Sequence, residues 1–155
     1  MALISVISFF ALPTFSWLDT YMLTYESEKL AEIFWYLRHK AMVCGNEQEL
    51  VLDEFNGQYV CNSHMKYMLD RRVIFGYLDD SFGPPSDPKY RIMHAVTMAG
   101  GRTTIVFKPN GTITPVSIYL VTKKRTYMMA VTVPVAHTSI VRIYRYHKNT
   151  WLIQN

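Results

Sequence analysis

The spacing of apolar residues divides the chain into a helical first half and a β-rich second half. Residues 27–42 carry apolar side chains at intervals of three and four, with Ser27 placed to cap a helix and Glu28 suited to its positive end. A second helical pattern covers residues 63–78. Between these two segments, residues 57–61 have the composition of a short strand. The first half therefore predicts one or two helices and one strand.

The second half alternates β-branched and aromatic runs with turn residues. A loop rich in proline, residues 79–88, separates it from the first half. Five runs after this loop predict the strands of an antiparallel meander, namely residues 91–98, 103–108, 112–121, 127–135 and 139–146. Helices followed by consecutive strands indicate an α+β fold, in which one or two helices pack on one face of an antiparallel sheet.

The N-terminal run forms a separate unit, because no charged residue precedes Asp19. It is shorter than the ~20 apolar residues of a membrane-spanning helix, so we expect no stable membrane insertion. Pro13 followed by small residues fits a signal peptide cleaved after Ser16, although no Lys or Arg follows the initial Met. A buried apolar strand and a truncated gene start remain alternatives. We predict a signal peptide over residues 1–16 and a single domain over residues 17–155.

Charge is distributed unevenly along the chain. The formal net charge is +4, from 16 Lys and Arg against 12 Asp and Glu. All of the acids lie in residues 1–87, whereas residues 88–155 contain ten Lys and Arg and no acid. A surface with this charge attracts polyanions such as RNA, DNA or anionic lipid headgroups. The alternative is that the acidic half folds against the basic half and neutralises it.

The chain has two cysteines, Cys44 and Cys61, separated by a polar segment. In an exported chain this pair predicts a disulfide, worth about 3 kcal/mol by loop closure. In a reducing compartment both would be ordinary buried thiols. Neither belongs to a Cys-x-x-Cys pattern, so we expect no metal, and the sequence suggests no cofactor.

Histidines are the remaining candidates for acid and base catalysis, because the second half has no carboxylate. Two histidines and a cation could cleave RNA by moving protons while the cation stabilises the charged intermediate. The candidate residues are His94, His147 and Lys124. The alternative is that these histidines are structural or surface residues, as His137 is expected to be in its turn.

Cations alternate with aromatic rings near the end of the chain. A strand period of two over residues 142–148 places two cations and two tyrosines on one face, and residues 123–125 add a basic turn. Single-stranded RNA is bound in this way, through phosphates on cations and bases on rings. The candidate RNA-binding residues are Lys123, Lys124, Arg125, Arg142, Tyr144, Arg145, Tyr146 and Lys148. The alternative is a half-buried strand beside an edge-protecting lysine cluster.

The order Tyr59-Val60-Cys61, helix, proline-containing loop and sheet resembles the secreted ribonuclease-like effectors of powdery mildew fungi. Residues 118–127 are similar to the strand, charged turn and strand of those effectors. The resemblance implies a microbial ribonuclease-like fold with a curved sheet. It departs from the family pattern in having no cysteine after Cys61 and no catalytic Glu after Asp87. Tyr90, His94 and His147 would then be remnants of an active site.

The resemblance implies a secreted effector with an inactive ribonuclease-like fold. We expect it to act as a monomer, delivered into host cells, by binding host RNA or a host protein. One alternative is an active secreted ribonuclease that uses His94 and His147. Another is a purely protein-binding immune decoy.

Overall fold

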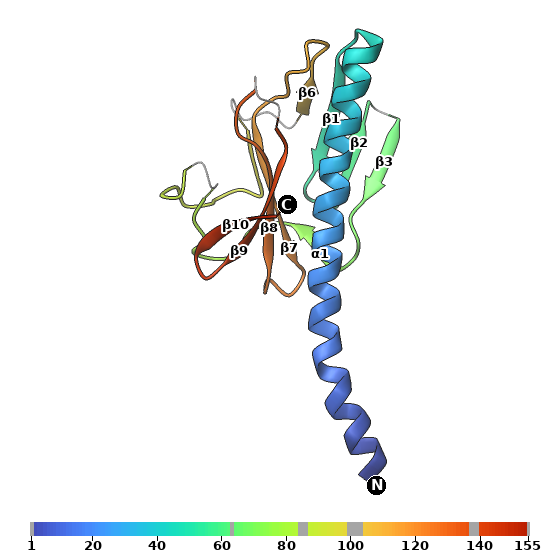
Figure 1. Cartoon of the computed structure of the whole chain (residues 1–155), viewed down its shortest axis with the longest axis vertical. Helices are drawn as coiled ribbons and strands as arrows, with labels where there is room; N and C mark the ends of the chain where they lie inside the picture. Colours follow the sequence, from blue (N-terminus) through green and yellow to red (C-terminus); the bar gives the residue numbers. More distant parts are fainter. Residues whose placement is uncertain (1, 63, 84–86, 99–103, 137–139, 155) are drawn as a thin grey trace.

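The computed structural model describes residues 2–62, 64–83, 87–98, 104–136 and 140–154, with side chains described from residue 17 onward. Within these residues, one long helix, α1 (Ala2–Cys44), lies against two antiparallel sheets (Figure 1). The strands are β1 (Gln48–Asp53), β2 (Gln58–Cys61), β3 (Met65–Met68), β4 (Val73–Phe75), β5 (Val96–Met98), β6 (Thr104–Phe107), β7 (Val116–Thr122), β8 (Met128–Val133), β9 (Arg142–His147) and β10 (Thr150–Gln154). The predicted α+β class is confirmed.

Helix α1 contains the predicted helix 27–42 and extends far beyond its N-terminal end. Ser27 is not a cap, because it lies inside the helix and its hydroxyl donates to the carbonyl of Leu23 at 2.8 Å. The C-terminal end of α1 lies close to the end of the predicted helix. Gly45, which follows Cys44, has a φ of +68°, and this left-handed backbone conformation ends the helix. The helix passes residue 16 without interruption, and cleavage after Ser16 stays a prediction.

The strands form two antiparallel sheets, and α1 contacts strands of both. One sheet has the order β3-β2-β1-β6, and the other has the order β10-β9-β8-β7-β4, with β5 also paired to β7. Every pairing is antiparallel, and β7 to β10 form consecutive hairpins. The predicted meander is therefore confirmed only from β7 to β9, and β10 extends it as a strand that the sequence pattern did not predict. The prediction of one five-stranded sheet is wrong, because β6 pairs with β1 in the other sheet and β5 pairs with β7.

The predicted helix over residues 63–78 is wrong. This stretch forms β3 and β4, of which β3 pairs with β2 and β4 pairs with β7. A short apolar run fits either a helical or a strand period, so partner strands decide its conformation. Here the side chains of Met65 and Tyr67 lie two residues apart and pack on the core. Asn62, at a φ of +50°, lies in the turn between β2 and β3.

Strand boundaries also differ from the predictions. The segment 91–98 contributes only the short β5, and Arg91 makes an isolated bridge to Phe82. Strand β1, which pairs with both β2 and β6, was not predicted, because its polar residues mask the alternation. Among the residues that separate the predicted strands, 100–101 lie outside the described residues, and so do 137–138, including His137.

The main core lies between α1 and the two sheets. The helix buries one face against both of them. The buried apolar residues of that face are Leu23, Leu30, Ala31, Ile33, Phe34, Leu37 and Ala41. Phe34 is fully buried and meets Phe107 of β6 edge to face, with ring centroids 5.3 Å apart. The helix therefore joins sheets that have no strand pairing with each other in the described residues.

A second, smaller core covers the far face of the second sheet. Tyr119 and Met128 are buried there under the ring of Trp151 from β10. The indole N–H of Trp151 donates to the carbonyl of Phe82 at 2.7 Å, which ties β10 to the loop before β5. Gly83 is required at this contact, because a Cβ there would clash with the indole nitrogen of Trp151.

The predicted disulfide is wrong, because Cys44 and Cys61 are both free thiols. Cys44 is exposed at the end of α1, whereas Cys61 is buried in β2. Burial raises the pKa of the Cys61 thiol above its usual value. The helix end and the strand thus place the two sulfur atoms in different environments.

Phe34→Ala should lower the free energy of unfolding by about 3–5 kcal/mol, because it removes a buried ring and leaves a cavity. Trp35→Ala is the matched control, since the next ring along the helix is exposed. It should cost less than about 1 kcal/mol, including its contact with Arg38. Chemical denaturation monitored by circular dichroism measures both values. Equal losses would contradict the described orientation of α1.

The two thiols should react at very different rates with a thiol reagent such as dithionitrobenzoate. Cys44 should react within the mixing time of a native sample, and Cys61 should react only as the protein unfolds. Cys44→Ser should abolish the fast phase and leave the slow one. If the nonreduced protein contained no free thiol, the result would contradict the structure and support the predicted disulfide.

Candidate interaction surface

A basic hollow lies where α1 meets the turns before β4 and after β7. We call this end of the domain its foot, because the N-terminal part of α1 leaves the sheets there (Figure 1). We define it by the residues that line it, which are Asp19, Arg71, Arg72, Lys123 and Lys124. Its volume is about 300 Å³. The Lys124 ammonium lies 3.1 Å from one oxygen of Asp19, and the Arg72 guanidinium lies 3.9 Å from the other. One carboxylate on the helix thus holds cations from two separate turns.

Backbone hydrogen bonds hold the two turns together. The N–H of Lys123, after β7, donates to the carbonyl of Arg72, before β4, at 2.7 Å. Next to this bond, Val73 pairs with Thr122 in the β4–β7 ladder. The Thr122 hydroxyl is buried and accepts the N–H of Thr126 at 3.1 Å. The backbone of both turns is therefore fixed before any ligand binds.

The hollow has an excess of positive charge. Four cationic side chains and one carboxylate line it, which leaves a formal charge of +3. Arg71 and Lys123 are exposed, and neither forms an ion pair with any residue that the structure describes. Two cations are thus held in place by Asp19, and two remain open to solvent.

The face of α1 opposite the core forms a second candidate surface, the exposed stripe. It consists of Trp17, Tyr21, Tyr25, Glu28, Glu32, Trp35 and Tyr36, which recur at helical spacing on one side of the helix. Trp17 and Tyr21 are 68% and 54% exposed, and their rings stack with centroids 5.7 Å apart. Large aromatic rings that remain exposed in a row are typical of interaction surfaces.

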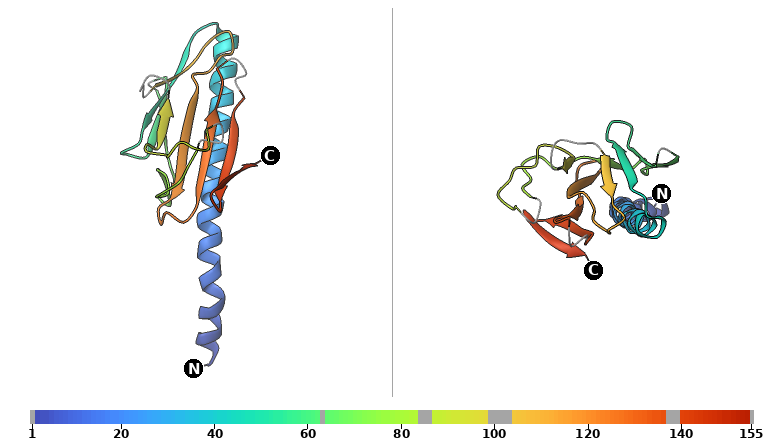
Figure 2. Two further views of the ribbon diagram at one scale, coloured as in Figure 1. Left: turned by 90° about the vertical axis from the view of Figure 1, so that its left-hand side faces the viewer. Right: turned by 90° about the horizontal axis from the view of Figure 1, so that it is seen from above.

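The N-terminal part of α1 extends past the ends of both sheets (Figure 2). Residues 2–18 of this helix contain no Lys, Arg, Asp or Glu. The first residue of the main core on the helix is Leu23. Among the residues that the structure describes, no helix combines the length and the apolarity that crossing a membrane requires.

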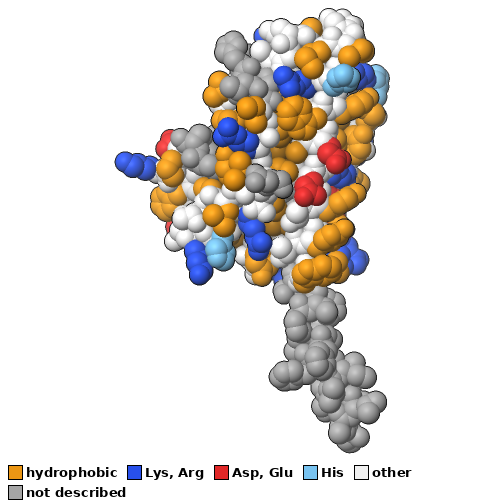
Figure 3. All heavy atoms as spheres, in the orientation of Figure 1, with side chains coloured by type: hydrophobic (Ala, Val, Ile, Leu, Met, Phe, Trp, Pro, Cys, Tyr) orange, Lys and Arg blue, Asp and Glu red, His pale blue; other side chains and the backbone are white. Residues whose placement is uncertain are grey.

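Figure 3 shows hydrophobic side chains gathered along the outer edge of the helix, with acidic side chains at mid-height. Below the domain, the helix continues away from it. The exposed stripe therefore follows the same rod that carries the uncharged segment, and the sheets of this chain cover neither of them.

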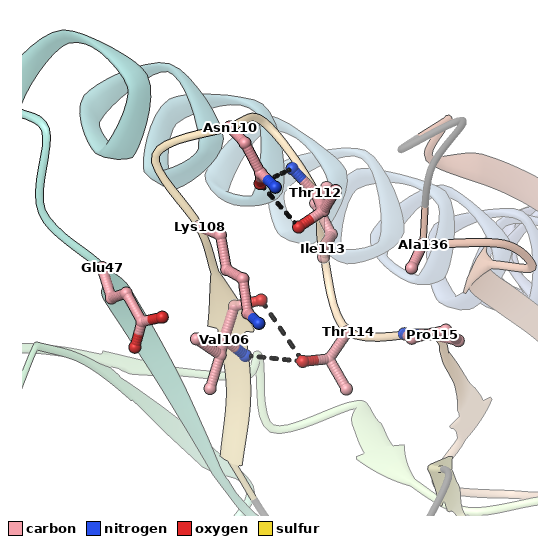
Figure 4. Close-up of a pocket in the computed structure, with 9 residues that line it drawn as sticks. All are labelled: Glu47, Val106, Lys108, Asn110, Thr112, Ile113, Thr114, Pro115 and Ala136. Carbon is pink, nitrogen blue, oxygen red and sulfur yellow. Dashed lines mark hydrogen bonds between the residues drawn. The ribbon is translucent and has the colours of Figure 1, made fainter.

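A larger pocket of about 500 Å³ lies at the other end of the domain, between β6 and the segment that leads into β7 (Figure 4). Its charged lining residues are Glu47 and Lys108. Its hydroxyl and amide groups largely bond to one another and to the backbone. The Thr114 hydroxyl accepts the N–H of Val106 at 3.1 Å, and Thr112 donates to the side chain of Asn110 at 2.8 Å. Few polar groups are left to converge on a ligand.

The predicted RNA-binding strand is β9, and its aromatic rings are used for packing. Tyr144 and Tyr146 pack on the second core, and the ring of Tyr146 lies 4.9 Å from that of Trp151. Ile143, on the opposite face, packs on the main core, which confirms the predicted alternation. Both rings are half-buried in this packing.

The remaining predicted cations make several different contacts. Arg145 lies over the ring of Tyr127 at 5.9 Å, and the Arg142 guanidinium donates to the Tyr144 hydroxyl at 3.5 Å. Lys148, at a φ of +47°, occupies the turn between β9 and β10. Acids from the first half pair with part of the basic half, as in the contact of Arg125 with Asp79 at 3.8 Å.

The three candidate catalytic residues lie in different parts of the structure. His94 is exposed before β5, and His147 is exposed at the end of β9 opposite Thr150. Lys124 belongs to the basic hollow, where it pairs with Asp19. No hydrogen bond or ion pair in the described part of the chain joins any two of them.

Comparisons with known proteins identify the fold. No family model matches the sequence, and no curated protein matches it. Two solved structures of the minor pseudopilin EpsH from the type 2 secretion system of Vibrio cholerae match the fold. The first has a TM-score of 0.57 at 10% identity and covers 78% of this chain and 94% of its own. The second has a TM-score of 0.53 at 13% identity and covers 79% and 95%. This chain has a pseudopilin-like fold.

The resemblance to ribonuclease-like effectors is therefore wrong, and so is the effector function drawn from it. It depended on a helix after Tyr59-Val60-Cys61, and the structure has strand β3 there instead. In this chain the long helix α1 precedes all of the described strands. An RNA-binding role loses its support together with the ribonuclease-like fold.

Sequence reasoning missed most of the two surfaces. It singled out Lys123 and Lys124 but not Asp19, Arg71 or Arg72, because the turns that bring them together are distant in the sequence. A signal for the exposed stripe was present, since its first aromatic residues are spaced four apart and continue the periodicity of α1.

Asp19→Asn should lower the free energy of unfolding by about 1 kcal/mol or less, because it leaves four cations without their carboxylate. The loss should shrink as salt screens the remaining repulsion. Asp80→Asn is the control, since both side chains of its ion pair with Arg91 are largely exposed, and its effect on the free energy of unfolding should be close to zero. Denaturant titrations at low and high salt measure both. A loss for Asp19→Asn that does not depend on salt would contradict the electrostatic origin.

Proposed function

We propose that this chain is a pseudopilin-like assembly subunit that joins copies of itself through the part of α1 that its own sheets leave uncovered. The observation that carries the proposal is the asymmetry of this helix. One face of its C-terminal part is buried against two sheets, and its N-terminal part extends beyond them. In this proposal the chain self-associates, in place of the expected monomer.

The exposed stripe supplies the apolar surface for such a contact. Trp17, Tyr21 and Tyr25 lie on successive turns, next to the uncharged residues 2–16. Parallel helices displaced along their axis would bring this uncharged segment of one copy beside the aromatic rings of the next. A contact of this head-to-tail kind produces rings or fibres.

Glu28 limits how far the helices can be displaced. Covering Tyr25 with residue 16 of the next copy needs a shift of nine residues, or about 14 Å. A shift beyond about 17 Å would press the uncharged segment onto the Glu28 carboxylate and remove its water. The assembly should therefore have an axial step of about 14–17 Å.

The two solved structures of similar fold offer coarse support for export of this chain from the cell. Both come from a secretion system, which is in keeping with the expected export of this chain. Delivery into host cells has no support in that likeness. In this proposal residues 2–16 belong to the working helix, and mass spectrometry of the mature chain would distinguish this from removal as a signal peptide.

Replacing Trp17, Tyr21 and Tyr25 together with Ser should weaken self-association by on the order of 100-fold or more, because buried aromatic anchors dominate such contacts. Sedimentation velocity of the full-length chain over a concentration series measures the change. The fold should be retained, since these rings lie outside the core.

Phe55→Ser is the matched control, because Phe55 is 97% exposed in the turn between β1 and β2, away from the helix stripe. It should leave self-association unchanged. A wild-type chain that stays monomeric at high concentration would contradict the proposal, as would equal effects of the helix and control variants.

A further inference from the structure

The basic hollow has the charge and the rigidity of an anion site, and it is separate from the exposed stripe. Asp19 lies on the domain side of α1, whereas Trp17 and Tyr21 face solvent. The formal charge of +3 exceeds what Asp19 can neutralise. Arg71 and Lys123 remain open for a ligand, since they form no ion pair with any described residue.

The geometry suits an oxygen-rich anion such as a phosphate. Guanidinium and ammonium groups come from two turns that are joined by the bond between Lys123 and Arg72. Arginine binds phosphate oxygens through paired N–H groups, and lysine acts as a point charge. A volume of about 300 Å³ accommodates a phosphate group with part of its substituents.

The position of the hollow identifies the source of the phosphate. It opens at the foot of the domain, beside the place where a helix without charged residues before Asp19 leaves it. Trp17 and Tyr21 are exposed at this same level. Aromatic rings and cations next to an uncharged helical segment form the arrangement that proteins place at the headgroup layer of a bilayer.

We propose that the basic hollow binds the phosphate groups of anionic lipids, so that the domain docks with its foot on an anionic membrane surface. The uncharged segment of α1 points into the lipid in this arrangement, and Trp17 and Tyr21 lie among the headgroups. This docking goes beyond the assembly function and does not depend on it, because the cations of the hollow take no part in the helix contact. Trp17 and Tyr21 serve the headgroup layer in docking and the neighbouring helix in assembly.

The test is binding of the full-length chain to vesicles made of equal parts phosphatidylglycerol and phosphatidylcholine, compared with phosphatidylcholine alone, at about 0.1 M salt. Replacing Arg71 and Lys123 with Gln should weaken binding to the anionic vesicles about 30-fold, at roughly 5-fold for each cation. Binding to phosphatidylcholine vesicles should not change. Co-sedimentation measures the partition coefficients.

The matched control replaces Lys66 and Lys108 with Gln, which removes the same charge from exposed positions away from the foot. It should weaken anionic binding by less than about 3-fold. Asp19→Asn should have the opposite effect and bind about 5-fold tighter, because it raises the charge of the hollow by one. Equal losses in the hollow and control variants would show that only net charge matters and would overturn the proposal.

A competition experiment distinguishes a lipid phosphate from a soluble phosphate as the ligand of the hollow. Glycerol 3-phosphate at millimolar concentration should not release the chain from the vesicles, because a single soluble phosphate lacks the many headgroups and the helix contact. Release would overturn the lipid assignment in favour of a soluble phosphate ligand. The Arg71 and Lys123 variant should still self-associate in the absence of vesicles, so failure of docking and failure of assembly are distinguishable.

Discussion

The structure depends on the apolar contact between one face of α1 and both sheets. Leu30, Phe34 and Leu37 are fully buried in that contact, where they meet residues of β1, β6, β7 and β8. Because the described strands of the two sheets do not pair with each other, the helix is what unites them. Burial of this one face also fixes the orientation of α1 about its own axis, and that orientation determines which of its side chains face solvent.

Two surfaces follow from this one constraint. With its buried face fixed, α1 presents an aromatic stripe on the other side, and it places Asp19 against the turns at the foot of the domain. The stripe is apolar and suits contact with another helix. The hollow is cationic and suits an anion. Because they differ in chemistry and in position, each can be altered without changing the other.

The uneven distribution of charge in the sequence has a structural explanation. The acid-free second half does not form an unbroken basic sheet, because acids of the first half fold against it at Asp19, Asp79 and Asp80. An excess of positive charge remains in the basic hollow, where two of the four cations pair with Asp19 and the other two form no ion pair with any described residue. The aromatic rings of β9 that accompany cations in the sequence stabilise the second core instead.

The sequence by itself determined the α+β class, the helix over residues 27–42 and the meander from β7 to β9. In these segments the apolar residues recur with a period of 3.6 in the helix and of two in the strands. Such a pattern is visible within the segment itself and needs no distant partner. Only the tertiary structure decided that residues 63–78 form strands and that β1 and β10 complete the sheets. It also decided that Cys44 and Cys61 stay apart and that Asp19 meets Lys124. Each of these depends on a partner distant in the chain, and burial against that partner outweighs local propensity.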